Sequence, residues 1–255
     1  MDITHFAAEQ AISTMWNRYA DPLSLDEIAD SAILSKFYFS RVFRSLTGTS
    51  PGRFLSAIRL FRAKNLLLET DMSVTEVAYG VGYNSLGTFT SRFTRSVGSS
   101  PGRYRAMSLA GTHSVLDMAP VPGPGPHGEV SGVVSFPETD DLLRVYVGLF
   151  PGPVVEGIPV ACDVLQAPGP FVLRDVPVGT WYLRAAAVGL RQAEPLPWQR
   201  RPALLGEHGH PHVGAHVRVS VGEMALRPSG FLDPPILRAL PELDNWELAE
   251  LHRVA

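Results

Sequence analysis

The sequence predicts two domains, an all-helical domain followed by a mostly β domain, and three observations lead to this fold class. In the N-terminal part, apolar residues recur at spacings of three and four, as at Phe54, Ile58 and Phe61, which is the period of a helix with one buried face. Downstream, short runs rich in β-branched residues are separated by Gly and Pro, which is typical of strands and turns. Between the two parts, APVPGPGPHG alternates Pro with Gly and can form neither a helix nor an inner strand. The predicted boundaries are 1–110 for the helical domain, 111–128 for the linker and 129–255 for the β-rich, sandwich-like domain.

An internal repeat organises the helical part. The phrases TGTSPGRFL at 47–55 and VGSSPGRYR at 97–105 are nearly the same. At an offset of 50 residues, Ser35, Phe39, Phe43 and Gly48 coincide with Ser85, Phe89, Phe93 and Gly98. A self-similarity of this length indicates one structural module that is used twice.

A capped helix is expected at the start of each module. Ser24 with Glu27, and Ser73 with Glu76, have the spacing of a capping box. In this motif the serine hydroxyl accepts a hydrogen bond from the glutamate's backbone amide, and the carboxylate accepts one from the serine's amide. We therefore expect short helices that start directly after Ser24 and Ser73.

A second helix is expected after a turn in each module. Ser35 and Ser85 are placed to cap this helix, and its two phenylalanines, four residues apart, share one face. Gly48 and Gly98 tolerate positive φ and are expected to end it. After the first module, Ser-Pro opens a joining helix within PGRFLSAIRLFRAKNLLLE, of which roughly 17 helical residues would span about 25 Å.

Two helices joined by a tight turn form a helix-turn-helix unit, whose second helix enters the DNA major groove. The charge distribution favours a polyanionic partner, because residues 35–105 hold 11 Lys and Arg against 3 Asp and Glu. Residues 111–255, in contrast, hold 10 against 16. The candidate DNA-binding residues are Ser35, Lys36, Phe37, Ser40, Arg41, Arg44, Ser85, Leu86, Gly87, Thr88, Ser91, Arg92 and Arg95.

The segment from Ser24 to Arg105 resembles the DNA-binding domain of AraC/XylS-type bacterial transcription regulators. The resemblance rests on FSRVFRSLTGTSP, on Arg59 and Ala63 in the joining helix, and on SVTEVAYGVGYNSLGTFTSRFTRSVGSSPGRYR. It implies a monomer that reads an asymmetric site on double-stranded promoter DNA with two helices in successive major grooves; RNA polymerase is a second candidate partner. The base-contacting residues that it implies are Phe37, Ser40 and Arg41 in the first helix and Leu86, Gly87, Thr88 and Ser91 in the second.

Two features depart from the family pattern. Ile33 occupies the first turn, where the family usually has a glycine, whereas the second turn keeps Gly82. Because a β-branched residue does not hold positive φ cheaply, we expect the first turn to differ. The second reading helix has no long polar side chain before Arg92, so phosphate contacts or a thymine methyl are the alternatives to base readout.

The C-terminal half has no comparable motif. PFVLRDVPVGTWYLRAAAVG predicts two strands around a turn, and Trp181, Leu183, Ala185 and Ala187 share one face of the second strand. The stretch is similar to transthyretin-like or carboxypeptidase-regulatory-like β-sandwich modules; gyrase-inhibitor-like ligand-binding domains are the alternative, but they require two longer helices. Such a domain would sense a small-molecule effector, support a homodimer, or serve as an interaction module without a ligand.

Histidines gather in EHGHPHVGAHV and suggest a metal site at His208, His210 and His212, because zinc and copper favour imidazole. Gly209 and Pro211 instead favour a solvated loop, so we predict no metal and no cofactor. Cys162 is expected to be a buried small hydrophobe. The apolar residues Leu243, Trp246, Leu248 and Leu251 have the spacing of a short C-terminal helix.

The remaining sequence signals concern location and catalysis. No stretch reaches the roughly 18 apolar residues of a membrane span, and the N-terminal MDITHFAAEQ lacks the order of a signal peptide. A single cysteine agrees with a reducing compartment, so the expected location is the cytoplasm. No nucleophile elbow, phosphate loop or paired-acid motif is found, and we predict no catalytic residues.

Overall fold

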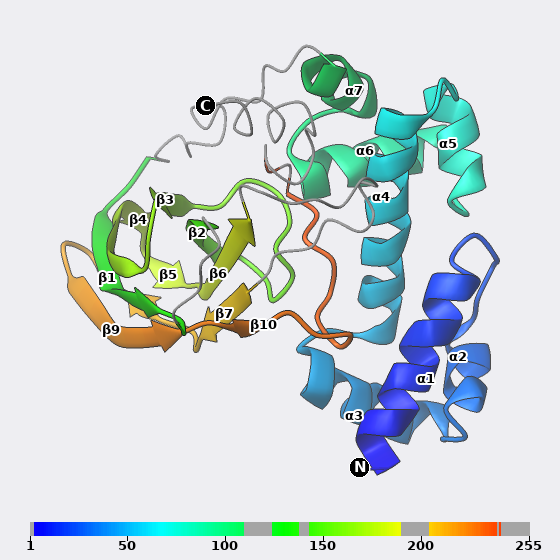
Figure 1. Ribbon diagram of the computed structural model, residues 1–255, viewed down its shortest axis with the longest axis horizontal. Coiled ribbons are helices and arrows are strands. Elements are labelled where there is room, and N and C mark those ends of the chain that lie inside the picture. The colour runs from blue at the N-terminus through cyan, green and yellow to red at the C-terminus, as the bar shows by residue number, and fades with distance from the viewer. Residues whose placement is uncertain (1–2, 110–123, 138–142, 190–203, 239, 241–255) are drawn as a thin grey trace. The chain divides into compact units, whose positions relative to one another are not determined.

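A computed structural model describes residues 3–109, 124–137, 143–189, 204–238 and 240 (Figure 1). The chain divides into a helical unit, Met1–Ala106 with Gly230–Leu237, and a β unit, Met107–Ser229 with Arg238–Ala255. The prediction of a helical N-terminal part and a mostly β C-terminal part is confirmed. The predicted linker up to residue 123 and the predicted C-terminal helix lie outside the described residues.

The helical unit follows the predicted order of capped helices. Its described helices are α1 (Ile3–Asn17), α2 (Leu25–Ser31), α3 (Lys36–Thr47), α4 (Pro51–Glu69), α5 (Val74–Gly80), α6 (Leu86–Val97) and α7 (Pro101–Leu109). Gly48 and Gly98 end α3 and α6 with φ of 71° and 96°, as predicted. The long α4, with Pro51 as its first residue, is the predicted joining helix (Figure 1).

The repeat extends to the packing of aromatic rings in the core. Phe43 meets Phe54 edge to face with ring centroids 5.4 Å apart. At an offset of 50 residues, Phe93 meets Tyr104 in the same arrangement at 5.6 Å. All four rings are fully buried, so each contributes both apolar burial and a favourable ring contact. The two modules are therefore built around the same internal contacts.

The β unit consists of short strands in three small sheets. The described strands are β1 (His127–Ser135), β2 (Leu143–Phe150), β3 (Ala161–Leu165), β4 (Gly169–Pro177), β5 (Gly179–Thr180), β6 (Tyr182–Gly189), β7 (Leu204–His208), β8 (His212–Val213), β9 (Arg218–Ala225) and β10 (Arg227–Pro228). Their orders are β4-β1-β9, β10-β7-β6-β2-β3 and β5-β8. Strand β9 runs parallel to β1, whereas the other pairs are antiparallel.

One apolar core joins the two larger sheets. Phe171 and Leu173 of β4 belong to the same buried cluster as Val145 and Val147 of β2. Two sheets that share a core between them form a sandwich. The predicted face of β6 is part of this cluster, with Leu183, Ala185 and Ala187 buried and Trp181 packed against it.

The chain changes sheets within the stretch PFVLRDVPVGTWYLRAAAVG. Strand β4 pairs with β1, whereas β6 pairs with β2 and β7, so the two predicted strands are not partners. Trp181 fixes the corner, because its indole Nε1 donates a hydrogen bond to the carbonyl of Pro177 at 2.9 Å. The turn residues thus connect the two layers of the sandwich.

The histidines of the β unit have local partners. The Nδ1 atom of His212 lies 3.0 Å from the hydroxyl of Thr180, and the rings of His210 and Tyr182 are nearly perpendicular with their centroids 4.3 Å apart. Among the described residues, no group of three or more His, Cys, Asp or Glu side chains is placed to hold a metal ion. Cys162 is half-buried rather than buried, and desolvation raises the pKa of its thiol, which disfavours the reactive thiolate. No helix within the described ranges is long and apolar enough to span a bilayer.

Candidate nucleic-acid interface

Both predicted capping boxes are confirmed. The amide of Glu27 donates to Ser24 Oγ at 3.2 Å, and the amide of Ser24 donates to Glu27 Oε2 at 2.9 Å. The corresponding distances for Glu76 and Ser73 are 3.2 and 2.7 Å. The pKa of Glu27 is lowered chiefly by the hydrogen bond from the Ser24 backbone, and that of Glu76 chiefly by the Ser73 hydroxyl. The ionised carboxylates therefore stabilise the N-terminal ends of α2 and α5.

Ile33 and Gly82 both take the left-handed backbone conformation, so the expectation that Ile33 changes the first turn is wrong at this position, although the second turn is one residue longer before its next helix. Ile33 has a φ of 56° and Gly82 a φ of 85°. The amide of Ile33 donates to the carbonyl of Asp30 at 3.0 Å, and the amide of Gly82 donates to that of Tyr79 at 3.0 Å. Ile33 is 92% exposed, so its side chain packs against little of the turn while its backbone stays in the left-handed region.

Helices α3 and α6, which the sequence analysis predicts to be the reading helices, differ at their first residues. The Ser85 hydroxyl accepts a hydrogen bond from the amide of Thr88 at 3.4 Å, as predicted for a cap. Ser35 occupies the cap position of α3 with an extended backbone, but its side chain makes no capping hydrogen bond. Ser35 is therefore the N-cap residue of α3, as predicted, but without the predicted side-chain hydrogen bond. Ser35 stays exposed at the entry of the helix.

Nearly all of the candidate DNA-binding side chains lie on the surface of the helical unit. Ser40 is half-buried, and the other residues of the set are exposed: Ser35, Lys36, Phe37, Arg41, Arg44, Ser85, Leu86, Gly87, Thr88, Ser91, Arg92 and Arg95. The opposite faces of α3 and α6 are held by the buried pairs Phe39–Phe43 and Phe89–Phe93. Each reading helix is thus fixed by its aromatic face and leaves its polar face to solvent.

Contacts along α3 orient its cations. The Lys36 ammonium lies 3.1 Å from Asp26 Oδ1 on α2, and 5.8 Å from the ring centre of Phe37. The Arg41 guanidinium lies 5.7 Å from the ring centre of Tyr38. Tyr38, which is 41% exposed, is absent from the sequence-predicted set; its spacing of three residues from Arg41 on a helix is the signal that could have identified it.

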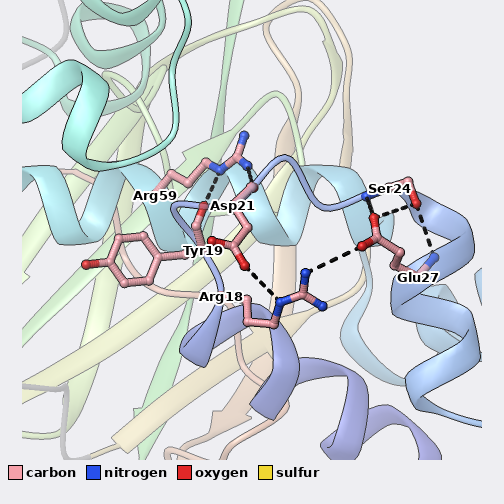
Figure 2. Close-up of polar contacts among 6 residues, drawn as sticks. All are labelled: Arg18, Tyr19, Asp21, Ser24, Glu27 and Arg59. Carbon is pink, nitrogen blue, oxygen red and sulfur yellow. Dashed lines mark hydrogen bonds and ion pairs between the residues drawn. The ribbon is translucent and has the colours of Figure 1, made fainter.

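Arg59 connects the joining helix to the loop between α1 and α2 (Figure 2). Its Nε atom donates to the carbonyl of Tyr19 and its Nη2 atom to that of Asp21, both at 2.7 Å. Burial lowers the pKa of Arg59, but a guanidinium in a protein stays charged, so both bonds are charge-assisted. Arg18 extends the network, because it bonds Asp21 Oδ2 at 2.8 Å and Glu27 Oε1 at 3.4 Å (Figure 2).

The loop that Arg59 holds also contacts the turn of the second module. A Cβ atom on Gly82 would lie 2.7 Å from the carbonyl oxygen of Ala20, so only glycine fits there. Ser56 of α4 adds a second contact, with its hydroxyl 3.4 Å from that of Tyr83. We call this set of contacts around Arg59, Ala20 and Gly82 the junction, because it joins α4 and the first module to the second.

Arg105 of α7 makes a similar contact with backbone carbonyls near the second module. It donates from Nε to the carbonyl of Leu67 at 2.8 Å and from Nη2 to that of Met72 at 2.6 Å. These carbonyls flank the entry to α5, as those bonded by Arg59 precede α2. Arg53 and Arg103, at the starts of α4 and α7, are exposed. Arg59 and Arg105 thus hold loops, whereas Arg53 and Arg103 face solvent.

Comparison with known proteins places this unit in a family. Residues 28–107 match the family model described as "Helix-turn-helix domain". The "HTH-type transcriptional activator RhaS" of Enterobacter sp. (strain 638) is 33% identical over 96 residues, which are 38% of this chain and 34% of the relative. The protein of the same name from Escherichia coli (strain K12 / DH10B) is 34% identical over 85 residues, 33% of this chain and 31% of the relative. The chain thus spans about a third of the length of the curated relatives that it matches.

Similar solved structures cover about two fifths of the chain. The DNA-binding domain of AdpA in complex with a target DNA is 34% identical with a TM-score of 0.39, and the match covers 40% of this chain and 93% of that one. A transcriptional regulator from Chromobacterium violaceum, described as having an AraC-type DNA-binding domain, is 29% identical with a TM-score of 0.38 and covers 40% and 92%.

The capped helix pairs and the family match define the matched part of the helical unit as a helix-turn-helix domain. Residues 28–107 are a helix-turn-helix domain of the AraC type.

Proposed function

We propose that the chain is a sequence-specific DNA-binding transcription regulator, which inserts α3 and α6 into successive major grooves of promoter DNA. The observation that carries the proposal is the pair of equivalently built helices with exposed polar faces in an AraC-type domain. Arg41 and Arg44 of α3, with Arg92 and Arg95 of α6, supply exposed cations for phosphates and base edges.

The length of α4 supports the use of both helices on one duplex. Its 19 residues span about 28 Å at 1.5 Å per residue, which is close to one turn of DNA, about 34 Å. The junction gives this spacing a fixed value, because Arg59 and Gly82 leave little room for rearrangement. The proposed binding site is asymmetric and spans two adjacent turns of the DNA duplex.

The β unit is proposed to modulate this activity, either by sensing a small-molecule effector or by contact between two copies of the chain. An interaction module without a ligand is the alternative, and RNA polymerase remains a candidate partner. A thermal-shift screen against metabolites separates these alternatives, because a ligand of the folded state must raise the unfolding midpoint.

Selection of bound duplexes from random DNA tests the proposed function, followed by anisotropy titrations with the selected site. Arg41→Ala should weaken binding to that site by about 1–3 kcal/mol and reduce the sequence preference at one base pair. Arg174→Ala is the matched control, because Arg174 is an exposed arginine on β4 of the β unit. The proposal is overturned if the wild-type chain enriches no sequence, or if its affinity does not fall with salt.

A further inference from the structure

We propose that Phe37 recognises a thymine in the first half of the site by packing on its C5-methyl group. This inference rests on the proposed function and adds the identity of one base to it. Phe37 is the second residue of α3, where the N-terminal residues of a recognition helix contact base edges. Its side chain is 78% exposed, so the ring has almost no partner within the described chain.

The fold does not need an aromatic residue at this position. In the repeat, Gly87 stands where Phe37 stands in the first module. The backbone around both is the same, since the amide of Phe39 donates to Ser35 at 2.8 Å and that of Phe89 donates to Ser85 at 3.0 Å. The second module thus builds an equivalent helix without this ring, and the exposed Phe37 requires another explanation.

The neighbours of Phe37 indicate what covers it. Lys36 places its ammonium 5.8 Å from the Phe37 ring, while Arg41 and Arg44 are exposed further along α3. An apolar ring among cations fits a surface that is anionic and has an isolated apolar group. The major groove offers this combination, because phosphates line it and the thymine methyl is the apolar group among its base edges.

The other three bases fit the ring less well. Guanine and adenine present hydrogen-bonding groups in the major groove, and cytosine has only a hydrogen at C5 beside its N4 amino donor, which a phenyl ring cannot satisfy. Covering such a group without a partner is unfavourable, so the ring selects thymine both by attraction and by exclusion. Arg41, one turn further along α3, remains free to bond a guanine in the neighbouring step.

The test uses two random duplex pools, one made with dTTP and the other with dUTP, which differ only in the C5-methyl group. The wild-type chain and Phe37→Ala are selected on both pools. For the wild type, one thymine position should be enriched in the first pool and lose its preference in the second. Removal of one methyl contact corresponds to about a fourfold loss of affinity. Phe37→Ala should lose the preference for thymine at the same position in the first pool, and its binding should not depend on whether the C5-methyl group is present.

Two further variants complete the experiment. Phe37→Leu keeps an apolar side chain at the site and should retain the thymine preference, whereas Val172→Ala, a truncation of an exposed apolar residue on β4, should behave as wild type. The proposal is overturned if the thymine position persists in the dUTP pool, if it persists in Phe37→Ala, or if the wild type enriches sites without it. A wild-type chain that enriches no sequence in either pool would instead refute the proposed function.

Discussion

Ile33 holds a backbone conformation that its side chain disfavours. A β-branched residue in the left-handed region is strained, and Ile33 has a φ of 56° with its side chain in solvent. The position is equivalent to Gly82, which adopts the same region without strain. The two connected helices therefore impose the turn conformation, and the residue at this position takes it up whether or not its side chain favours it.

Ile33→Gly should raise the free energy of unfolding by about 1 kcal/mol, because relief of the strain exceeds the entropy that glycine adds to the unfolded chain. Urea titration followed by the helical circular dichroism signal measures the change. Gly82→Ala is the contrasting variant. Its φ of 85° and the approach of a Cβ to 2.7 Å from the Ala20 carbonyl oxygen should destabilise the unit by about 2 kcal/mol or more. A loss of stability in Ile33→Gly would contradict the assignment of strain.

Some residue-level features followed from the sequence and others did not. The capping boxes were predictable because Ser24 and Glu27 act across three residues of one chain segment. The missing capping hydrogen bond at Ser35 was not, because a hydroxyl can rotate toward or away from the amides with no change in residue type. The loop-holding role of Arg105 also escaped prediction, since its partner carbonyls lie 33 to 38 residues away.

At the scale of elements, the two capping boxes make the stability of α2 and α5 depend on pH. Glu27 and Glu76 have pKa values lowered by their serine partners, so their stabilisation is complete above the unfolded-state pKa of about 4.3. It is lost as the pH falls through the lower folded-state pKa. The double variant Glu27→Gln/Glu76→Gln should therefore show a smaller loss of thermal stability between pH 6 and pH 3 than the wild type.

Thermal unfolding of the helical signal at each pH measures this difference. Asp30→Asn is the control, because Asp30 is an exposed carboxylate on α2 that lies outside the capping box. It changes the net charge by the same amount per substitution. An equally steep pH profile in the double variant and the wild type would show that the capping boxes do not cause the pH dependence of thermal stability.

The junction should determine how strictly the two half-sites must be spaced on DNA. One inserted base pair moves the second half-site by about 3.4 Å and rotates it by about 35°, which a rigid pair of reading helices cannot follow. Arg59→Ala leaves the carbonyls of Tyr19 and Asp21 without their charged donor, which should cost about 1–3 kcal/mol of stability. The variant should also lose less affinity than the wild type when the spacer is lengthened.

Anisotropy titrations with the selected site and with spacers one base pair longer or shorter test this expectation. Arg105→Ala is the matched control, because it removes the same kind of loop contact within the second module. It should weaken binding at all spacings alike. If Arg59→Ala discriminates between spacers as strongly as the wild type, the junction does not set the spacing.

The β unit shows the limit of element prediction. Alternation of apolar residues identified the face of β6 that is buried, with Leu183 and Ala187 in the core. It could not identify the partners of β4 and β6, which lie in different sheets. A period of two fixes which side of a strand is covered but carries no information on which strand lies beside it.

At the scale of the whole molecule, the division into a helical and a β unit was predictable from composition, but the path of the chain was not. The segment Gly230–Leu237 groups with the helices, and Leu232 packs against the core formed by α1 to α4. The segment GFLDPPIL is short and interrupted by two prolines, so its apolar residues show no helical or strand periodicity that would signal this contact. The predicted domain boundaries at 110 and 128 remain predictions.

The opposite charges of the two halves should affect DNA binding over a distance. Residues 1–110 hold 12 Lys and Arg against 9 Asp and Glu, whereas residues 111–255 hold 10 against 16. DNA is attracted by the first part and repelled by the second. The repulsion acts through solvent, so salt should remove it as the screening length falls from roughly 10 Å at 0.1 M to about 3 Å at 1 M.

A variant with four C-terminal carboxylates neutralised, Glu242→Gln/Asp244→Asn/Glu247→Gln/Glu250→Gln, tests this expectation without changing any described residue. It should bind a non-specific duplex roughly two- to fivefold more tightly than the wild type at 50 mM salt, and the two affinities should converge as salt rises to about 0.5 M. Anisotropy titrations over this range measure the ratio. A ratio that stays constant with salt would mean that the substitutions act through structure, because a direct effect of charge must be screened.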